Sequence, residues 1–443
     1  YRRQRQMCIR DSFETSNPLV NQIHKNSYWG IRSNYRGMPT DCPQRDERMG
    51  YTGDGQVFAL TGAYNFNTDA FWKNFLRDLE LGQLDNTEGY VCATVPQTGP
   101  AGIGFISMLG WGNAVTILPE MMYRQFGDEE ALPRQYESMK LFVEAEIRKM
   151  GKKNLWIGPS LGDWLAMGKG IAWQAMHNNP VSNAFIVHDL KVISETAERL
   201  GKREDAARYR RQLAATTDAY IKKFVSKNGI VAKDYQSAYI MALKYVLPEG
   251  ELRERVKKNF VANIRKNGLQ TGFFATEHLL PLLVEAGEQK LAYDVLLQEN
   301  CPGWMYQVKC GATTTWERWD ALKPDGTVNE EKMAGSGENM VSFNHYAFGS
   351  VGEFYYQYIL GIRPEKPGFA KLHFAPYPDE RLGGVSGSYL SVAGKIESAW
   401  RYEADGCHIR LATPVEAVVL LPDGRSENVP AGTYEWTVKR PNL

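Results

Sequence analysis

The amino-acid sequence predicts a mainly α-helical protein, an (α/α)6 barrel or toroid, followed by a small antiparallel β-sandwich. Two observations carry this prediction. Helical spacing of apolar residues recurs over residues 16–362, and it changes to period two after the proline-containing segment 363–367. The chain of 443 residues is long enough for a large and a small domain. We therefore expect the barrel over residues 13–363 and the sandwich over residues 364–443.

About twelve helices are expected, arranged in pairs, which is about six hairpins. Asn17 and Pro18 supply a cap and a first-turn proline for the first helix. Helix stops are expected at Gly127, Gly151, Gly201 and Gly287. Six hairpins favour a closed ring; a superhelical solenoid is the alternative, although no fixed sequence period is present. The predicted helices cover residues 17–36, 54–67, 68–83, 109–126, 129–150, 180–200, 203–224, 235–246, 250–267, 275–286, 288–300 and 345–361.

The carboxyl-terminal part shows strand-like alternation with hairpin signals. Asp405-Gly406 and Asp423-Gly424 are dipeptides typical of tight turns. Strands are expected at residues 389–393, 395–402, 408–412, 416–421 and 433–438. No cluster of acidic residues occurs here, so we expect this part to buttress the helical domain.

Composition narrows the functional classes. A formal net charge of +1 gives no indication of a nucleic-acid partner. The sequence contains no apolar run of about 18 residues, so no membrane span is predicted. The six cysteines and seven histidines show no metal-ligand spacing, so no metal or cofactor is expected, and a disulfide framework is not expected at this length. The 11 tryptophans suit both sugar stacking and a large core.

The amino end is basic and lacks the apolar stretch of a signal peptide. Residues 1–12 (YRRQRQMCIRDS) resemble translated sequencing-adapter sequence. We interpret them as a non-native leader and expect the natural protein to extend further upstream. The compartment is therefore not predicted, with a periplasmic or secreted location slightly favoured over a cytoplasmic one, and the oligomeric state is not predicted either.

Charge is concentrated in the segment DCPQRDERMGYTGD, residues 41–54. Pro43 and Gly50 break any helix, so the segment is predicted to be a loop. Helical spacing resumes at Val57, which places Asp54 near a helix start, where a carboxylate can cap free N–H groups. A solvated charged loop is one interpretation. The interleaved uncharged residues and the nearby arginines favour sugar hydrolysis, which needs one protonated carboxyl beside ionised ones.

A second loop, TTTWERWD at residues 313–320, places Glu317 between Trp316 and Trp319. Desolvation by the indoles would raise the pKa of this carboxyl, whereas the adjacent Arg318 would lower it, so the net direction stays open. The alternative is a pair of core tryptophans with Glu317 in an ion pair.

Three further spots combine polar and aromatic residues: Trp111 in GWGN, Trp164 after GD, and His345 in FNHYA. Their alternatives are core tryptophans and a core imidazole with satisfied hydrogen bonds. A purely structural role is expected for four residues on helix faces, His188, His278, Asp189 and Glu277.

Taken together and in their order along the chain, these motifs resemble those of the bacterial α-L-rhamnosidases of glycoside hydrolase family 78. The motifs are DCPQRDER and GYTGD within residues 41–54, GWGN at 110–113, GDW at 162–164, TTWERW at 314–319 and FNHYAFGS at 343–350. The resemblance extends from about residue 13 to the end of the chain. It implies an (α/α)6 barrel, a C-terminal β-sandwich and upstream β-domains that this chain lacks. It also implies release of terminal α-L-rhamnose with inversion at the anomeric carbon.

The resemblance implies roles for single residues. Glu47 would be the general acid that protonates the glycosidic oxygen, and Glu317 the general base that activates a water on the opposite ring face. Single displacement needs these carboxyls about 6.5–9.5 Å apart. Desolvation and negative charge from Asp41 or Asp54 would keep Glu47 protonated. The implied sugar-contacting residues are Asp41, Arg45, Asp46, Tyr51, Asp54, Trp111, Trp164, Trp316, Trp319 and His345.

Three positions depart from the family's usual pattern. Tyr51 stands where tryptophan is common, and it can still stack on a sugar. Asn113 stands where aspartate is common, and Ala321 where glycine is usual. We expect the latter two to bear on the outer subsites and on the aglycone preference.

An inverting exo-acting α-L-rhamnosidase is the favoured hypothesis, with a rhamnose-containing glycoside or polysaccharide as substrate. A second hypothesis is another (α/α)6 carbohydrate enzyme, either a different exo-glycosidase or a lyase. A lyase would abstract a proton with a tyrosine or histidine and would not need two opposed carboxyls. A third is a catalytically silent sugar-binding protein.

Overall fold

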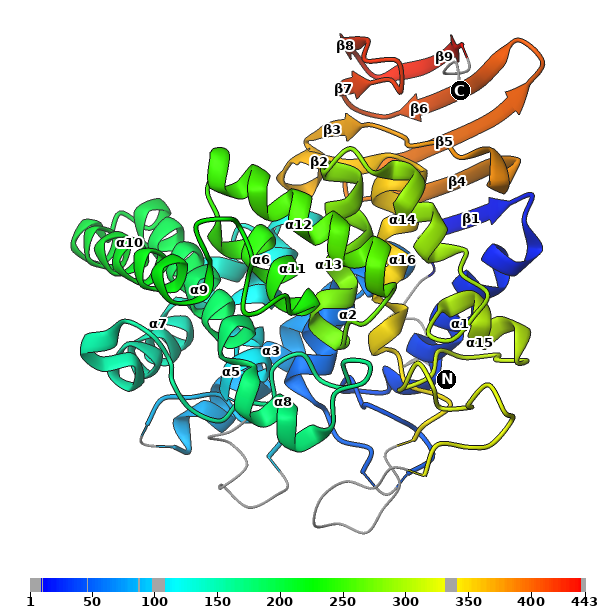
Figure 1. Ribbon diagram of the computed structural model, residues 1–443. Helices are drawn as coiled ribbons and strands as arrows, with labels where there is room; N and C mark the ends of the chain where they lie inside the picture. Colours follow the sequence, from blue (N-terminus) through cyan, green and yellow to red (C-terminus); the bar gives the residue numbers. More distant parts are fainter. Residues whose placement is uncertain are drawn as a thin grey trace.

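The computed structural model describes residue 9 and residues 11–45, 47–86, 88–97, 108–330 and 341–439. Its helices make up the larger part of the molecule (Figure 1), and their contacts close them into a ring. The inner segments of the ring are α2 (Thr52–Asn65), α6 (Ala114–Phe126), α9 (Asn179–Arg199), α11 (Gln236–Met241) with the π-helical turn Ala242–Val246, α13 (Phe273–Glu285), and the turn Ala347–Val351 with α16 (Gly352–Phe354). Each segment contacts the next, and the turn before α16 contacts α2 again. The described helices therefore close a ring and exclude a solenoid.

An outer helix precedes each inner segment in the chain. The outer helices are α1 (Pro18–Asn34), α3 (Asp69–Leu84), α7 (Ala131–Met150), α10 (Arg203–Phe224), α12 (Glu251–Asn267) and α14 (Gln289–Leu296). This alternation is the (α/α)6 architecture, which confirms the predicted fold class. Two short helices were not predicted, α8 (Ile171–His177) and α15 (Trp304–Lys309), because they are too short to show a helical period; α5 (Met108–Trp111) is a single turn.

The predicted helix ends are confirmed where they rest on caps. The Asn17 side chain accepts hydrogen bonds from the N–H groups of Leu19 and Val20, and Pro18 occupies the first turn of α1. Gly127 and Gly151 end α6 and α7 with φ of 66° and 55°, a region that non-glycine residues rarely adopt.

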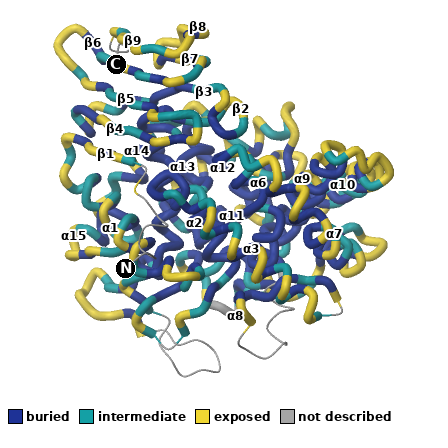
Figure 2. The backbone as a smooth tube through the Cα atoms, turned by 180° about the vertical axis from the view of Figure 1, so that it is seen from behind, coloured by how far each residue is buried: buried dark blue, intermediate teal, exposed yellow. Residues whose placement is uncertain are grey.

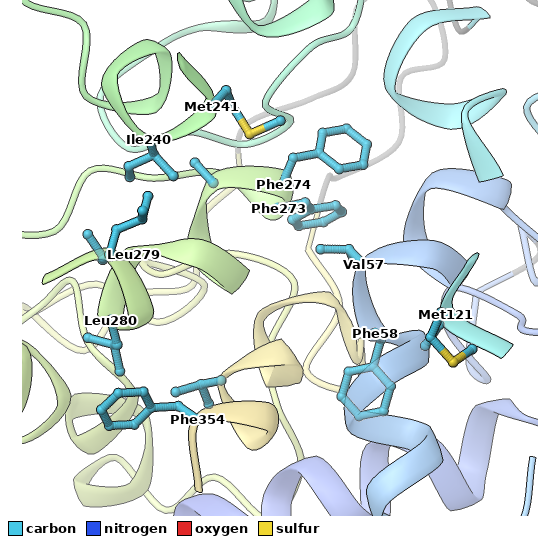
Figure 3. Packing of buried hydrophobic residues seen from close by; sticks show 14 of the residues in the cluster. Val57, Phe58, Met121, Ile240, Met241, Phe273, Phe274, Leu279, Leu280 and Phe354 are labelled. Atoms are coloured by element: carbon cyan, nitrogen blue, oxygen red, sulfur yellow. The ribbon is translucent and has the colours of Figure 1, made fainter. Parts of the chain in front are cut away.

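Apolar side chains of the inner helices fill the middle of the ring. In Figure 3, Phe58 of α2, Phe273 of α13 and Phe354 of α16 lie among the packed residues; all three are at most 3% exposed. Figure 2 shows the inner segments as buried and much of α10 as exposed, as expected for an outer helix. Each fully buried phenylalanine or leucine contributes about 1.5–3 kcal/mol to stability. No helix in the described part of the chain is long and apolar enough to cross a bilayer.

Two sheets lie at one end of the helical ring (Figure 1). The five-stranded antiparallel sheet has the order β1 (Asp11–Thr15), β4 (Gly384–Ser391), β5 (Gly394–Glu403), β6 (Gly406–Thr413) and β9 (Gly432–Val438). The four-stranded sheet has the order β2 (Ile362–Lys366), β3 (Lys371–Phe374), β7 (Ala417–Leu420) and β8 (Ser426–Val429). In the second sheet β3 and β7 are parallel, which corrects the expectation of a wholly antiparallel sandwich. The parallel pairing is possible because three strands of the other sheet separate β3 from β7 in the chain.

The amino-terminal strand joins the carboxyl-terminal sheet. Asp11 and Ser12 lie opposite Tyr389 and Ser388 across β1 and β4. Asn65, at the end of α2, donates a hydrogen bond of 3.0 Å to Asp11. The boundary predicted between residues 12 and 13 therefore falls inside β1. The boundary predicted between the two domains, at residues 363 and 364, falls inside β2.

The inner helices end at the sheets. The Tyr64 hydroxyl, in the last turn of α2, donates to the Ile362 carbonyl at 2.9 Å, and the Trp400 indole donates to the Ile359 carbonyl at 2.7 Å. The amino-terminal ends of these helices, and the loops that lead into them, therefore lie at the opposite end of the ring (Figure 1).

Candidate active site

The charged loop before α2 is closed on itself. The Asp41 N–H donates to the Met49 carbonyl at 3.1 Å, and the Met49 N–H donates to Asp41 Oδ1 at 2.9 Å. Gly50 then pairs with Val95, and a side chain at Gly50 would meet the Val95 carbonyl at 2.4 Å. Only glycine permits this close approach, which ties the loop to the neighbouring segment.

The second predicted loop is held beside the first. The Glu317 N–H donates to the Ser342 carbonyl at 2.9 Å, and the His345 N–H donates to the Thr315 carbonyl at 2.8 Å. Gln44 of the first loop donates to Ser342 Oγ at 2.7 Å. Three segments that are distant in sequence therefore meet at the amino-terminal ends of the inner helices.

Arg45 joins the two loops. Its Nη1 lies 2.7 Å from Glu317 Oε2 and its Nη2 lies 3.0 Å from Glu317 Oε1, which is a two-point ion pair between residues 272 positions apart. Nη2 also lies 2.6 Å from Glu47 Oε2 and 3.4 Å from Asp41 Oδ2. One guanidinium thus contacts the predicted acid, the predicted base and a third carboxyl.

The shared guanidinium limits the gap between Glu47 and Glu317. Since Nη2 lies 2.6 Å from Glu47 Oε2 and 3.0 Å from Glu317 Oε1, these oxygens are at most about 5.6 Å apart. Carboxyls of inverting glycosidases are about 6.5–9.5 Å apart, and those of retaining ones about 5–5.5 Å. With Arg45 between them, the nearest oxygens are closer than the inverting range.

Tyr51 contacts the predicted acid directly. Its hydroxyl donates a hydrogen bond of 2.6 Å to Glu47 Oε1. Burial raises the pKa of Tyr51 above its usual value of 10, and the charge of Glu47 raises it further. The phenol therefore stays protonated and acts as a donor. Sequence reasoning assigned this residue a stacking role and missed the hydroxyl contact, for which spacing alone gave no signal.

Asp54 and His345 form a buried pair beneath the loops. His345 Nε2 lies 3.1 Å from Asp54 Oδ2, while Nδ1 accepts from the Ala347 N–H at 3.3 Å. Asp54 lies in the first turn of α2, but its carboxylate bonds this imidazole, which corrects the expected helix-capping role. Burial raises the pKa of Asp54, against the effect of His345. Burial lowers the pKa of His345, but the hydrogen bond to Asp54 and the charges of Asp54, Glu317 and Asp41 outweigh it, so this pKa is raised above 6.5.

Asp41 is a buried carboxyl whose pKa is raised by its surroundings. It is 1% exposed, and burial raises its pKa to about 6. The charges of Glu47 and Asp54 act in the same direction, whereas His345 opposes them. The folded protein therefore bears the cost of an ionised Asp41 above pH 6, and this cost disappears as the pH falls from about 6 toward 3.8.

Two of the aromatic residues predicted to contact the sugar, Trp111 and Trp164, pack against each other. The Trp111 and Trp164 rings meet edge to face with centroids 6.4 Å apart, and Trp111 also meets Phe274 at 5.2 Å. The Asp163 side chain accepts from the N–H groups of Phe274 and Ala275 at the start of α13, which holds the Trp164 loop in place. Trp164 is partly exposed, whereas Trp111 is 3% exposed.

The tryptophans beside Glu317 differ from each other. Trp316 lies edge to face with Phe343 at 5.1 Å. Trp319 is 1% exposed; it stacks on Phe348 at 4.1 Å, and its indole donates to the Thr271 carbonyl. Trp319 therefore packs as part of the core. The remaining predicted site residue, Asp46, lies outside the described residues.

Asn113 belongs to a buried network below the loops. Its side-chain amide donates to Asp189 and, at 3.3 Å, to Glu146 Oε1. Burial raises the pKa of Asp189 to about 7, and it raises that of Glu146 well above its usual value. Ala321 is also fully buried, in a small cluster with Tyr306 and Trp316.

Asn113→Asp is expected to destabilise the protein, because an amide donor between two buried acids becomes a third acid. The loss of unfolding free energy should be about 1–3 kcal/mol or more at pH 7.5, and smaller at pH 5, where the extra carboxyl takes up a proton. Urea unfolding at both pH values measures it. The matched control is Asn300→Asp at an exposed position, and equal stability of the two variants at pH 7.5 would contradict the network.

Three groups of side chains in the described part of the chain have the donor set of a metal site, and the third of them, Glu403, Asp405 and His408, lies at the surface of the sheets. The oxygen and sulfur atoms of Asp41, Cys42 and Glu47 lie within 4.8 Å of one another, as do the ligand atoms of Glu277, His278 and Glu353. In the first group Arg45 already supplies the positive charge. In the second, Lys244 supplies it and lowers the pKa of Glu353, although burial outweighs it and raises that pKa to about 7. Sequence reasoning treated Glu277 and His278 as unremarkable and missed Glu353.

The ring of hairpins and the carboxylate cluster at one end define the six-hairpin glycosidase class of domain. The family described as bacterial alpha-L-rhamnosidase six-hairpin glycosidase domain matches residues 10–359. The bacterial alpha-L-rhamnosidase C-terminal domain matches residues 361–434.

Individual proteins similar to this chain are named alpha-L-rhamnosidases. The alpha-L-rhamnosidase of Alteromonas sp. (strain LOR) is 34% identical over 413 residues, which are 91% of this chain and 44% of that protein. The solved structure of the Streptomyces avermitilis alpha-L-rhamnosidase complexed with L-rhamnose superimposes with a TM-score of 0.90 at 31% identity, over 98% of this chain and 42% of that one. The Aspergillus terreus enzyme gives a TM-score of 0.89 at 31% identity, over 98% and 50%. The chain belongs to the bacterial α-L-rhamnosidase family, and it spans less than half the length of the curated relatives it matches.

Proposed function

We propose that this chain hydrolyses terminal, non-reducing α-L-rhamnosides by single displacement, with inversion at the anomeric carbon. The observation that carries the proposal is the Arg45 cluster, which brings Glu47 and Glu317 together from opposite ends of the helical domain's sequence. Family membership, and a relative whose solved structure contains L-rhamnose, supply the sugar.

Glu317 is the general base in this proposal. Its side chain is 2% exposed and both oxygens are bound by Arg45. The guanidinium fork holds both carboxyl oxygens in place for taking a proton from water. Glu47 is the general acid, and its side chain is more accessible, with 18% exposed.

Inversion requires a wider gap between the two glutamates than this structure has, so we propose a rearrangement on sugar binding. In that rearrangement Arg45 would leave Glu47 and turn toward the hydroxyls of the rhamnose, which would free Glu47 Oε2 to carry a proton. A water then fits between Glu317 and the anomeric carbon, as a single displacement requires. The family resemblance gives Asp41, Asp54 and His345 to further sugar hydroxyls and Trp111, Trp164 and Trp316 to the methyl group and ring face. Since all of these except Trp164 are buried in this structure, the rearrangement must also uncover them.

The first sugar released from 4-nitrophenyl α-L-rhamnopyranoside is expected to be β-L-rhamnose. Proton NMR during the first minutes of hydrolysis distinguishes the anomers, with free rhamnose as the standard for mutarotation. Formation of the α-anomer first would contradict inversion and would fit the narrow gap between the carboxyls. Binding without turnover would indicate a sugar-binding protein, and an unsaturated product a lyase.

A further inference from the structure

Tyr51 occupies a fixed place beside the proposed general acid. It is the last residue before α2, its N–H donates to the Met49 carbonyl at 3.0 Å, and it bridges to Thr94 on the neighbouring segment. This backbone position brings its hydroxyl to 2.6 Å from Glu47 Oε1. Among the aromatic side chains, only tyrosine carries a hydrogen-bond donor at the far end of its ring. Phenylalanine has no donor, and the N–H of an indole lies at another position.

The two oxygens of Glu47 have different partners. Oε1 accepts from Tyr51 and Oε2 contacts Arg45. When Arg45 turns to the sugar, as in the proposed function, Tyr51 remains the partner that fixes the carboxyl. Oε1 is then occupied by a hydrogen bond, and Oε2 is the oxygen left to hold the proton.

We propose that Tyr51 is a positioning residue for the general acid, orienting Glu47 and stabilising the carboxylate that remains after proton transfer. The inference rests on the proposed function. The proton moves from Glu47 Oε2 to the glycosidic oxygen, the bond from the anomeric carbon to that oxygen breaks, and its electron pair leaves with the aglycone. In the same displacement the oxygen of a water bonds to the anomeric carbon, and Glu317 takes a proton from that water. The hydrogen bond from the Tyr51 hydroxyl stabilises the negative charge left on Glu47, because a hydrogen bond to an ionised carboxylate is charge-assisted.

The test compares Tyr51→Phe with the unaltered chain on two substrates. The 4-nitrophenyl rhamnoside has a leaving group that departs without protonation, whereas methyl α-L-rhamnoside needs the acid. We expect kcat/KM to fall about 10–100-fold on the methyl glycoside, the range for losing a hydrogen bond to a charged group, and less than about 3-fold on the nitrophenyl one. The alkaline limb of the pH–rate profile on the methyl glycoside should move to higher pH, because the donor that stabilises the ionised acid is gone.

Two further variants make the comparison sharp. Tyr209→Phe is the matched control, because Tyr209 donates to Glu144 Oε1 at 2.7 Å on the outer helices, and it should leave both substrates and the pH profile unchanged. Tyr51→Trp keeps a large aromatic ring without the hydroxyl, and it should show the same dependence on the leaving group as Tyr51→Phe. It also serves if Tyr51→Phe fails to fold, which thermal unfolding reports.

The outcomes separate the inference from the function beneath it. If Glu47→Gln turns over the methyl glycoside normally, or the unaltered chain has no activity, the proposed function fails and takes the inference with it. If Glu47→Gln is impaired while both Tyr51 variants match the unaltered chain, only the inference fails. An equal loss on both substrates, or a rise in KM alone, would show that Tyr51 acts as a pocket wall and would overturn the positioning role.

Discussion

Replacing Glu317 with glutamine is expected to lower kcat about 10²–10⁴-fold on every rhamnoside, the usual contribution of a general acid or base. The physical reason is that an amide cannot take the proton of the attacking water, whatever the leaving group. The size of the loss should therefore be the same for the nitrophenyl and the methyl glycoside.

Glu47→Gln should behave differently. It should lower kcat by a similar factor on the methyl glycoside but much less on the nitrophenyl one, because nitrophenolate departs unprotonated. Glu144→Gln on the outer helices is the control and should match the unaltered chain, since Glu144 pairs with Arg208 far from the cluster. Identical profiles for Glu47→Gln and Glu317→Gln across the two substrates would refute the division of roles. Near-normal turnover by either variant would refute the assignment of that residue.

Arg45→Met is expected to have the largest effect on stability among single changes at the site. It leaves Glu317, with 2% of its side chain exposed, as a buried carboxylate without its cation. Breaking a buried pair by removing one partner costs about 3–5 kcal/mol. Turnover should fall as well, because the guanidinium no longer positions the carboxyls. Urea unfolding and kcat/KM on the nitrophenyl glycoside measure the two effects.

A double variant separates charge from packing. Arg45→Met combined with Glu317→Gln should regain most of the lost stability, because a neutral amide needs no buried cation, and it should stay inactive. Arg208→Met is the control for an exposed ion pair, where about 0–1 kcal/mol is expected. A single Arg45→Met variant as stable as Arg208→Met would show that the cluster does not depend on this guanidinium.

The helical domain could be predicted because its signals are local. Periodicity and caps such as Asn17 and Gly127 act within a few residues, and the structure has the helices where these signals placed them. The short strands β1, β2, β3 and β8 were missed. β2 contains Pro364 and β8 is the polar run SENV, so neither shows the alternation typical of a half-buried strand.

The site was predicted as a set of residues but not as a set of contacts. Arg45, Glu47 and Glu317 were all expected, yet nothing in their spacing shows that one guanidinium binds both glutamates. Asp54 was expected to cap a helix because it lies near a helix start. Its actual partner, the imidazole of His345, was missed because it lies 291 positions later in the chain. These pairings depend on closure of the ring, which is a tertiary event that no local pattern encodes.

The pairing of β1 with β4 has a consequence for folding order. During synthesis from the amino end, the segment 11–15 emerges long before its partner at residues 384–391 exists. Contacts so remote in sequence form slowly, since a long loop must close before they contribute. Residues 384–391 therefore complete a pairing that β1 has awaited, and the edge offered by β1 stays open to other strands until those residues have been synthesised.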